Sequence, residues 1–298
     1  MTIRPNRRQF MALAGAAALS LRAGSAHAIA DSPATTVVWS GEGEFFGGFS
    51  GIEVSADRSS ALVISDRGFA VRTRLIRDAN ETLTGIEALE HFPLLGRRGQ
   101  PVRGGRGDTE GLDEGPDGTL HVSFEGQRRS RVARYADPRG RARELVQRRD
   151  WRELPGNRGL EALALDPDGI VYTIPEEMSD GSFPLYWLDD NRWRIAAQLA
   201  GGDDFAPVGM DFGPDGHLYL LERKFRLAFF GTRISRLRQG NLGQREILVE
   251  TSYGALDNHE GISITRDGSG QLWATTISDD NQNRFQRTEI CEFPLPSA

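Results

Sequence analysis

The sequence predicts an all-β fold, a β-propeller of five four-stranded antiparallel blades. One pattern occurs five times, with copies that begin at Ser50, Glu110, Glu161, Val208 and Glu260. The starts are separated by 60, 51, 47 and 52 residues, close to the roughly 40 to 50 residues of propeller repeats. No segment after residue 28 shows a sustained helical period. A sixth blade is the alternative if the long first repeat contains an additional one.

Each repeat reads as a blade. An apolar inner strand leads into a tight turn that carries Asp-Gly, where glycine supplies a positive φ. A second strand follows, such as 120–125 (LHVSFE) or 218–223 (LYLLER). Two further strand-like runs complete the fourth repeat, at 232–238 and 245–251. Four antiparallel strands per repeat are the composition of a propeller blade.

The ends of the chain predict how the ring closes. Only 38 residues follow Glu260, enough for three strands. We expect residues 35–40 (TTVVWS) to supply the fourth strand of the last blade from the N-terminal side. Closure of this kind removes the exposed edges of an open sheet.

Residues 1–28 have the features of a twin-arginine signal peptide. Arg7 and Arg8 precede a short apolar run, 11–21, and Ala26-His27-Ala28 resembles a cleavage site. The run is too short to span a bilayer, and no cysteine near the cleavage site offers a lipid anchor. We expect export by the twin-arginine machinery to the periplasm or beyond, with 29–298 as one propeller domain. An arginine-rich tail is the alternative.

Composition excludes several classes of function. The chain has 36 basic and 42 acidic residues, a net charge of −6, and the basic residues are scattered and are all arginine except Lys224. Nucleic-acid binding needs a basic face or a recognised module, so no nucleic-acid partner is expected. Cys291 is the only cysteine, which excludes an internal disulfide framework. The sequence contains no zinc-protease motif, glycine-rich nucleotide loop or complete nucleophile elbow.

The repeats predict two sets of side chains at one mouth of the central channel. The inner-strand ring consists of the residues that begin each copy, Ser50, Glu110, Glu161, Val208 and Glu260. The second-strand ring lies at the far end of the next strand, which the hairpin folds back to the same mouth. Its members are Asp66, Glu125, Glu176, Glu222 and Asp279.

Clustered carboxylates repel each other unless a positive charge shares the space. Oxygen-rich, sulfur-free clusters suit calcium or magnesium. We therefore expect a divalent cation, calcium by preference. Its expected ligands are Glu110, Glu125, Glu161, Glu176, Glu260 and Asp279. In the alternative interpretation, the carboxylates accept backbone N–H bonds and only brace adjacent blades.

The same mouth supplies candidates for catalysis. Glu110, Glu161 and Glu260 are candidate general bases as well as ligands. His259, in the loop-like segment DNHEG, is the histidine best placed to act. The residues expected to clamp an anionic substrate by bidentate contacts are Arg67, Arg223 and Arg287.

Several of these segments together resemble a known family. GGFSGIEV, DTEGLDEGPDG, GMDFGPDGHLYLLER and NHEGISI are similar to the esterase-like-activity-of-phytase, or phytase-like, family of exported bacterial propellers. The resemblance covers about residues 36–295 and implies an ester or phosphoester hydrolase with a small anionic or ester substrate. Val208 and Ser50 depart from the glutamate of the other copies. The alternatives are a non-catalytic propeller that binds a ligand or an envelope partner, and a calcium-dependent lactonase or sugar-processing propeller.

Overall fold

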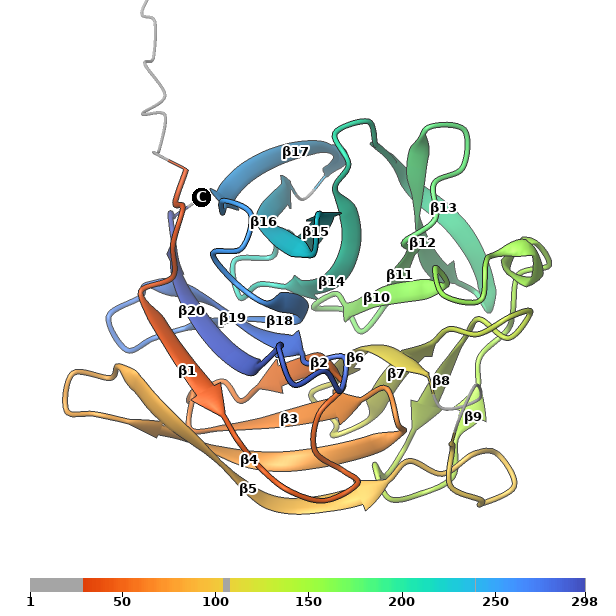
Figure 1. Cartoon of the computed structure of the whole chain (residues 1–298). Coiled ribbons are helices and arrows are strands. Elements are labelled where there is room, and N and C mark those ends of the chain that lie inside the picture. Colours follow the sequence, from red (N-terminus) through yellow and green to blue (C-terminus); the bar gives the residue numbers. More distant parts are fainter. Residues whose placement is uncertain (1–28, 104–107, 239, 298) are drawn as a thin grey trace, which may run out of the picture.

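The computed structural model describes residues 29–103, 108–238 and 240–297. They form five four-stranded antiparallel sheets around a central axis (Figure 1). This confirms the predicted propeller and its five blades. The predicted signal peptide, residues 1–28, lies outside the described residues. In the described part of the chain no helix is long and apolar enough to cross a membrane.

The blades follow one another in chain order. Blade 1 consists of β2 (Phe49–Val54), β3 (Ser60–Ser65), β4 (Phe69–Arg77) and β5 (Leu83–Pro93). Blade 2 consists of β6 (Thr109–Glu114), β7 (Leu120–Phe124), β8 (Arg131–Tyr135) and β9 (Arg143–Glu144). A 3₁₀ helix, η1 (Asp150–Glu153), leads to blade 3, which consists of β10 (Leu160–Leu165), β11 (Val171–Pro175), β12 (Ser182–Asp189) and β13 (Arg192–Ala200). Blade 4 consists of β14 (Ala206–Phe212), β15 (Leu218–Arg226), β16 (Phe229–Arg238) and β17 (Asn241–Glu250).

Blade 5 combines both ends of the chain, as predicted. β18 (Asn258–Arg266), β19 (Leu272–Asp279) and β20 (Thr288–Leu295) are joined by β1 (Thr35–Trp39), the outermost strand. In Figure 1 the red β1 lies beside the blue β20. Glu292 of β20 also accepts bonds from two arginines of blade 1, Arg58 at 2.9 Å and Arg77 at 2.6 Å. These buried ion pairs hold the closing blade against the first.

Five hydrophobic cores stabilise the ring, one at each interface between adjacent blades. Between blades 1 and 2, for example, Ile64 packs in one cluster with Val122. Every residue of β10, LEALAL, is buried, because a blade is covered on both faces. This explains why β10 has a nearly continuous apolar sequence rather than a strict alternation.

The first hairpin of every blade contains a β-bulge at the same place. The register shifts between Phe49 and Gly51 in blade 1, and at the equivalent residues of β6, β10, β14 and β18. A bulge adds one residue to a strand and redirects a side chain. The shift falls at the residue that begins each sequence repeat, and this places the inner-strand ring.

Candidate functional site

Backbone packing brings the inner strands close together at the bulge. A Cβ atom on Gly111 would lie 2.5 Å from the backbone nitrogen of Leu163, and one on Gly209 would lie 2.4 Å from the carbonyl oxygen of Glu260. Each of these glycines follows a residue of the inner-strand ring. They allow adjacent blades to approach, so that side chains from different blades meet at the axis.

An acidic cluster from blades 2 and 3 lies at this mouth. Carboxylate oxygens of Asp108, Glu110 and Glu125 all lie within 4.8 Å of one another, and Glu110 and Glu125 are each 8 % exposed. Burial, followed by repulsion from Glu161 and Glu125, raises the pKa of Glu110 well above its ordinary value. The predicted meeting of Glu110, Glu125 and Glu161 is therefore present, and Asp108 is an additional member.

Glu125 and Glu161 form a hydrogen-bonded pair of carboxyl groups. Burial raises the pKa of Glu125 to about 7, although the bond to Glu161 and a 3.1 Å bond from the amide of Gly159 oppose the shift. Burial and repulsion from Glu125 also raise the pKa of Glu161 well above its ordinary value. Burial therefore favours the protonated form of this carboxyl pair.

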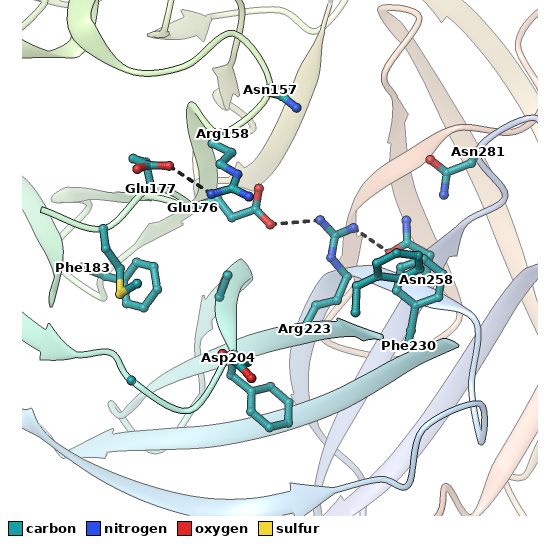
Figure 2. A pocket seen from close by; sticks show the side chains of 15 residues that line it. Asn157, Arg158, Glu176, Glu177, Phe183, Asp204, Arg223, Phe230, Asn258 and Asn281 are labelled. Atoms are coloured by element: carbon teal, nitrogen blue, oxygen red, sulfur yellow. Dashed lines mark hydrogen bonds and ion pairs between the residues drawn. The ribbon is translucent and has the colours of Figure 1, made fainter. Parts of the chain in front are cut away.

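Arg223 supplies the positive charge at the opposite side of the mouth. Its guanidinium donates to Glu176 at 3.1 Å, to Asn258 at 2.6 Å and to Glu260. Asn258 also donates to Glu260 at 2.8 Å. Figure 2 shows the dashed contacts that run from Glu176 through Arg223 to Asn258. Arg223 therefore lies at this mouth, as predicted. In the structure its guanidinium pairs with the protein's own carboxylates, Glu176 and Glu260.

The assignment of Glu222 to the second-strand ring was wrong. Pro207 pairs with Glu222, as Leu160 pairs with Pro175 in blade 3, so the residue equivalent to Glu176 is Arg223. Glu222 points the other way, because neighbouring strand residues face opposite sides. It is fully buried against Ser235, at 2.6 Å, and Arg245.

Acidic side chains continue around the mouth into blades 1 and 5. Oδ1 of Asp66 is buried and has no hydrogen-bond partner among the described residues. Burial and repulsion from Asp108 raise the pKa of Asp66 to about 6. Burial and repulsion from Glu260 raise the pKa of Asp279 to about 8. The predicted residue Asp279 therefore faces the same acidic space.

His259, the histidine predicted to be catalytic, does not reach the mouth. The residue is 1 % exposed, and Nε2 lies 3.7 Å from the sulfur of Cys291 and 3.9 Å from Glu289. It precedes Glu260 on β18, so its side chain points to the opposite face of the strand. Burial opposes the charge on His259, but its interactions with Cys291 and Glu289 raise the pKa to about 9.

The other two predicted arginines make their hydrogen bonds and ion pairs outside the group formed by Asp108, Glu110 and Glu125. Arg67 donates to the carbonyl oxygen of Glu44 at 3.2 Å, and its charge opposes the rise in the pKa of neighbouring Asp66. Arg287 precedes β20, the third strand from the axis, and pairs with Glu289 at 2.6 Å. Of the three arginines, Arg223 is the one for which the described residues show ion pairs with carboxylates of the two mouth rings.

A different ring of side chains holds adjacent blades together. Its members lie three residues after those of the inner-strand ring. Asp113 accepts a 2.6 Å bond from the amide of Leu165 in the next blade, and Ser263 accepts a 3.0 Å bond from the amide of Val54. Asp211 makes the same kind of contact with blade 5. The bracing expected as an alternative role for the mouth glutamates is thus present at a deeper position. Ser50 of the mouth ring also braces, through a 2.5 Å bond to the carbonyl of Thr109.

The mouth carboxylates fit a hard divalent cation. Asp108, Glu110 and Glu125 offer converging oxygens, and Asp66 offers a buried oxygen with no partner among the described residues. Calcium takes about six to eight oxygen ligands in flexible geometry. No sulfur or imidazole accompanies these oxygens, which disfavours softer metals. These residues are therefore the candidate metal ligands.

A cleft of about 880 Å³ opens beside the mouth, between blades 3 and 4. Glu176, Arg223 and Asn258 line one part of it (Figure 2). Aromatic side chains, among them Phe225 and Phe230, line another. Its volume lies within the roughly 300 to 1,000 Å³ of small-molecule sites. A substrate in this cleft would reach the acidic mouth through Glu176 and Arg223.

Comparison with known proteins gives one family and a common fold. The family model described as "Phytase-like: Esterase-like activity of phytase" matches residues 44–282. No curated protein matches the sequence.

Many solved structures share the fold at low identity. They include a putative exo-β-1,3-galactanase from Bifidobacterium bifidum s17, with 12 % identity and a TM-score of 0.50 over 84 % of this chain and 89 % of that chain. A bifunctional GH43-CE protein from Bacteroides eggerthii has 11 % identity and a TM-score of 0.52 over 91 % of this chain and 35 % of that chain. A gluconolactonase from Xanthomonas campestris has 16 % identity and a TM-score of 0.44 over 85 % of this chain and 77 % of that chain. At these identities the likeness to the first two shows the fold alone.

Proposed function

The chain belongs to the phytase-like family, and from this premise we propose that it is a calcium-dependent hydrolase of carboxylic or phosphoric esters. The observation that carries the proposal is the group of carboxylate oxygens of Asp108, Glu110 and Glu125 within 4.8 Å of one another. They lie at the mouth of a channel, beside a cleft of about 880 Å³. The family model over residues 44–282 confirms the resemblance of the sequence to this family, and the reaction is the proposal.

We assign the cation to Asp108, Glu110 and Glu125, with Asp66 as a further ligand. A bound divalent cation lowers the pKa of water and neutralises developing negative charge. Three of the six ligands expected from the sequence, Glu161, Glu176 and Glu260, have other partners: Glu161 is bonded to Glu125, and the other two are paired with Arg223.

The chain's own residues supply the acid–base and binding steps. Glu161, whose carboxyl group is bonded to Glu125 and is not among the assigned ligands, would accept the proton of the attacking water. Arg223 lines the cleft and would orient the carbonyl or phosphoryl oxygen of the ester. Glu176 and Glu260 hold the guanidinium of Arg223 in position.

A test compares the wild type with Glu110→Gln and an exposed control, Glu87→Gln. The mature chain, 29–298, is tested on a panel of carboxylic esters, lactones and phosphate esters, with calcium or with a chelator. We expect calcium-dependent turnover that falls by roughly 100-fold or more in Glu110→Gln and is unchanged in Glu87→Gln. Elemental analysis should find calcium in the wild type and less in Glu110→Gln. The absence of metal-dependent turnover on every ester would overturn the proposal.

A non-catalytic ligand-binding propeller is the second candidate. The observation that favours it is the double pairing of Arg223 with Glu176 and Glu260, which neutralises part of the acidic mouth without a metal. Metal content and melting temperature that are the same in Glu110→Gln and in the wild type would support it.

We also propose export by the twin-arginine pathway, on the sequence of residues 1–28. Replacing Arg7 and Arg8 by lysine should retain the protein in the cytoplasm. The measurement is the distribution of the protein between cell fractions.

A further inference from the structure

The second strand of blade 4 extends beyond the mouth of the channel. β15 continues to Arg226, three residues past Arg223, and β16 begins at Phe229. In blades 2 and 3 the equivalent strands, β7 and β11, end at Phe124 and Pro175, one residue before the second-strand ring. The β15–β16 hairpin is therefore an addition to the repeat, on the side where the cleft opens.

The extension exposes large apolar side chains. Phe225 is 64 % exposed, Leu227 82 % and Phe229 57 %. The rings of Phe225 and Phe230 lie with their centroids 5.0 Å apart. Exposed apolar groups gathered at one place mark an interaction site more often than a structural one.

The tip of the hairpin has an unfavourable backbone for its residues. Leu227 and Ala228 have φ values of 51° and 69°. Both central residues of a two-residue type I′ turn need positive φ, so asparagine and glycine are usual there. A leucine in this conformation costs about 1 to 2 kcal/mol. A strained and exposed apolar tip is better explained by binding than by folding.

The cleft below the hairpin has an apolar side and a polar side. Phe225, Phe230, Met178 and Phe183 line the apolar side. Met178 packs over Gly201, where a Cβ atom would lie 2.3 Å from its sulfur, so its place in the wall depends on that glycine. In Figure 2 the ion-paired polar groups lie across the middle of the cleft, with Phe183 on one side and Phe230 on the other.

The charges of the cleft do not suit a polyanion. Its acidic lining residues are Glu176, Glu177 and Asp204, and its basic ones are Arg158 and Arg223. Both arginines are paired, Arg158 with Glu177 at 3.3 Å and Arg223 with Glu176 at 3.1 Å. A substrate with many phosphates would therefore meet no excess of positive charge among the residues that line the cleft.

We infer that the β15–β16 hairpin and Met178 bind an apolar part of the substrate. This inference rests on the ester hydrolysis proposed above. The substrate is an ester that carries an aromatic or alkyl group, and it is not a polyphosphate. The apolar group lies against Phe225 and Phe230, and the ester bond then faces Arg223 and the acidic mouth.

The test measures binding without catalysis. It uses two amides, N-benzylacetamide and N-methylacetamide, which resemble benzyl acetate and methyl acetate but are not expected to be cleaved. Binding of N-benzylacetamide and N-methylacetamide is measured by calorimetry or by NMR for the wild type, for Phe225→Ala and for Phe225→Ala/Phe230→Ala. Phe285→Ala is the control, because Phe285 is 79 % exposed and does not line the cleft. Melting temperatures check that each variant is folded, and Phe225→Ala removes an exposed side chain at little cost to the core.

We expect the benzyl compound to bind the wild type at least roughly tenfold more tightly than the methyl compound. The preference should shrink in Phe225→Ala, disappear in the double variant and persist in Phe285→Ala. Equal affinity for the two compounds, or no binding of the benzyl compound, would overturn the inference. So would tight binding of inositol hexakisphosphate that the double variant retains.

Failure of the proposed function gives a different result. One outcome is that no ester is hydrolysed while the preference for the benzyl compound is still lost in the double variant. The hydrolase proposal is then wrong, and the inference that the apolar side of the cleft binds an apolar group is supported. The other outcome is that esters with aryl, alkyl and methyl groups are hydrolysed with equal kcat/KM. The hydrolase proposal is then supported, and the inference that the apolar side of the cleft binds the substrate is wrong.

Discussion

Replacing Arg223 by methionine removes the positive charge between two mouth glutamates and keeps most of the apolar stem. The side chains of Arg223, Glu176 and Glu260 are only 20 %, 16 % and 14 % exposed. Removing one partner of a buried ion pair costs about 3 to 5 kcal/mol, and partial solvation reduces this to roughly 2 to 4 kcal/mol. For a domain of this size we expect the melting temperature to fall by roughly 5 to 10 °C.

The sign of the pH dependence distinguishes lost charge from lost packing. Burial already raises the pKa of Glu260 in the folded protein, and loss of Arg223 raises it further. An acid with a raised folded pKa destabilises the protein above its unfolded pKa, about 4.3. This effect disappears as the acid becomes protonated in both states. The loss of stability in Arg223→Met should therefore be large at pH 8 and much smaller at pH 5.

Urea denaturation at the two pH values measures this difference. The control is Arg74→Gln, which removes an ion pair with Glu87 whose side chains are 61 % and 54 % exposed and should cost less than about 1 kcal/mol. Millimolar calcium should restore part of the stability of Arg223→Met, because it would neutralise the same mouth. An equal loss at pH 5 and pH 8, or a loss no larger than that of Arg74→Gln, would refute this account of the charges.

Three further outcomes are expected. Calcium at about 100 times its Kd should stabilise the wild type by about 2.7 kcal/mol, as measured in a thermal melt, and should stabilise Glu125→Gln much less. Equal stabilisation of the two proteins would show that Glu125 is not a calcium ligand. Ser263→Ala should lower the free energy of unfolding by about 1 to 3 kcal/mol, because the buried amide of Val54 loses its acceptor at 3.0 Å, and should leave the calcium response intact. The pKa of His259 is raised to about 9, so its contribution, up to about 3 kcal/mol, is complete below pH 6.5 and is lost as the pH rises through 9. Urea titrations from pH 6 to pH 9.5 should show this decline in the wild type and not in His259→Gln.

The fold could be predicted because its signals are local and repeated. Asp-Gly turns and apolar strands occur at near-constant spacing, and the 38 residues after Glu260 left one strand to be supplied by 35–40. The structure has that strand as β1. The meeting of Glu110, Glu125 and Glu161 followed from the same repeats, because equivalent positions in a propeller converge on its axis.

The errors arose where one residue decides the direction of a side chain. Glu222 and Arg223 are adjacent, and matching the copies by acidic residue selected the wrong one. Only the pairing of Pro207 with Glu222 across the bulge shows that Arg223 faces the mouth. His259 was misplaced for the same reason, since it is one residue from Glu260 on β18. Asp108 was missed because the other blades have no acidic residue at its position, for example Gly159 in blade 3.

Blade 4 is the blade in which the repeat changes most, and three of its changes lie at the proposed site. Val208 replaces a glutamate of the inner-strand ring, and Arg223 replaces an acid of the second-strand ring. The β15–β16 hairpin adds the wall that carries Phe225. A ring with five identical acidic positions would hold a cation but would give a substrate no preferred direction. Arg223 and the apolar side chains of the β15–β16 hairpin lie on one side of the mouth, and Asp108, Glu110 and Glu125 lie on the other. Because the two sides differ chemically, a substrate would bind in one orientation, which catalysis by the proposed site requires.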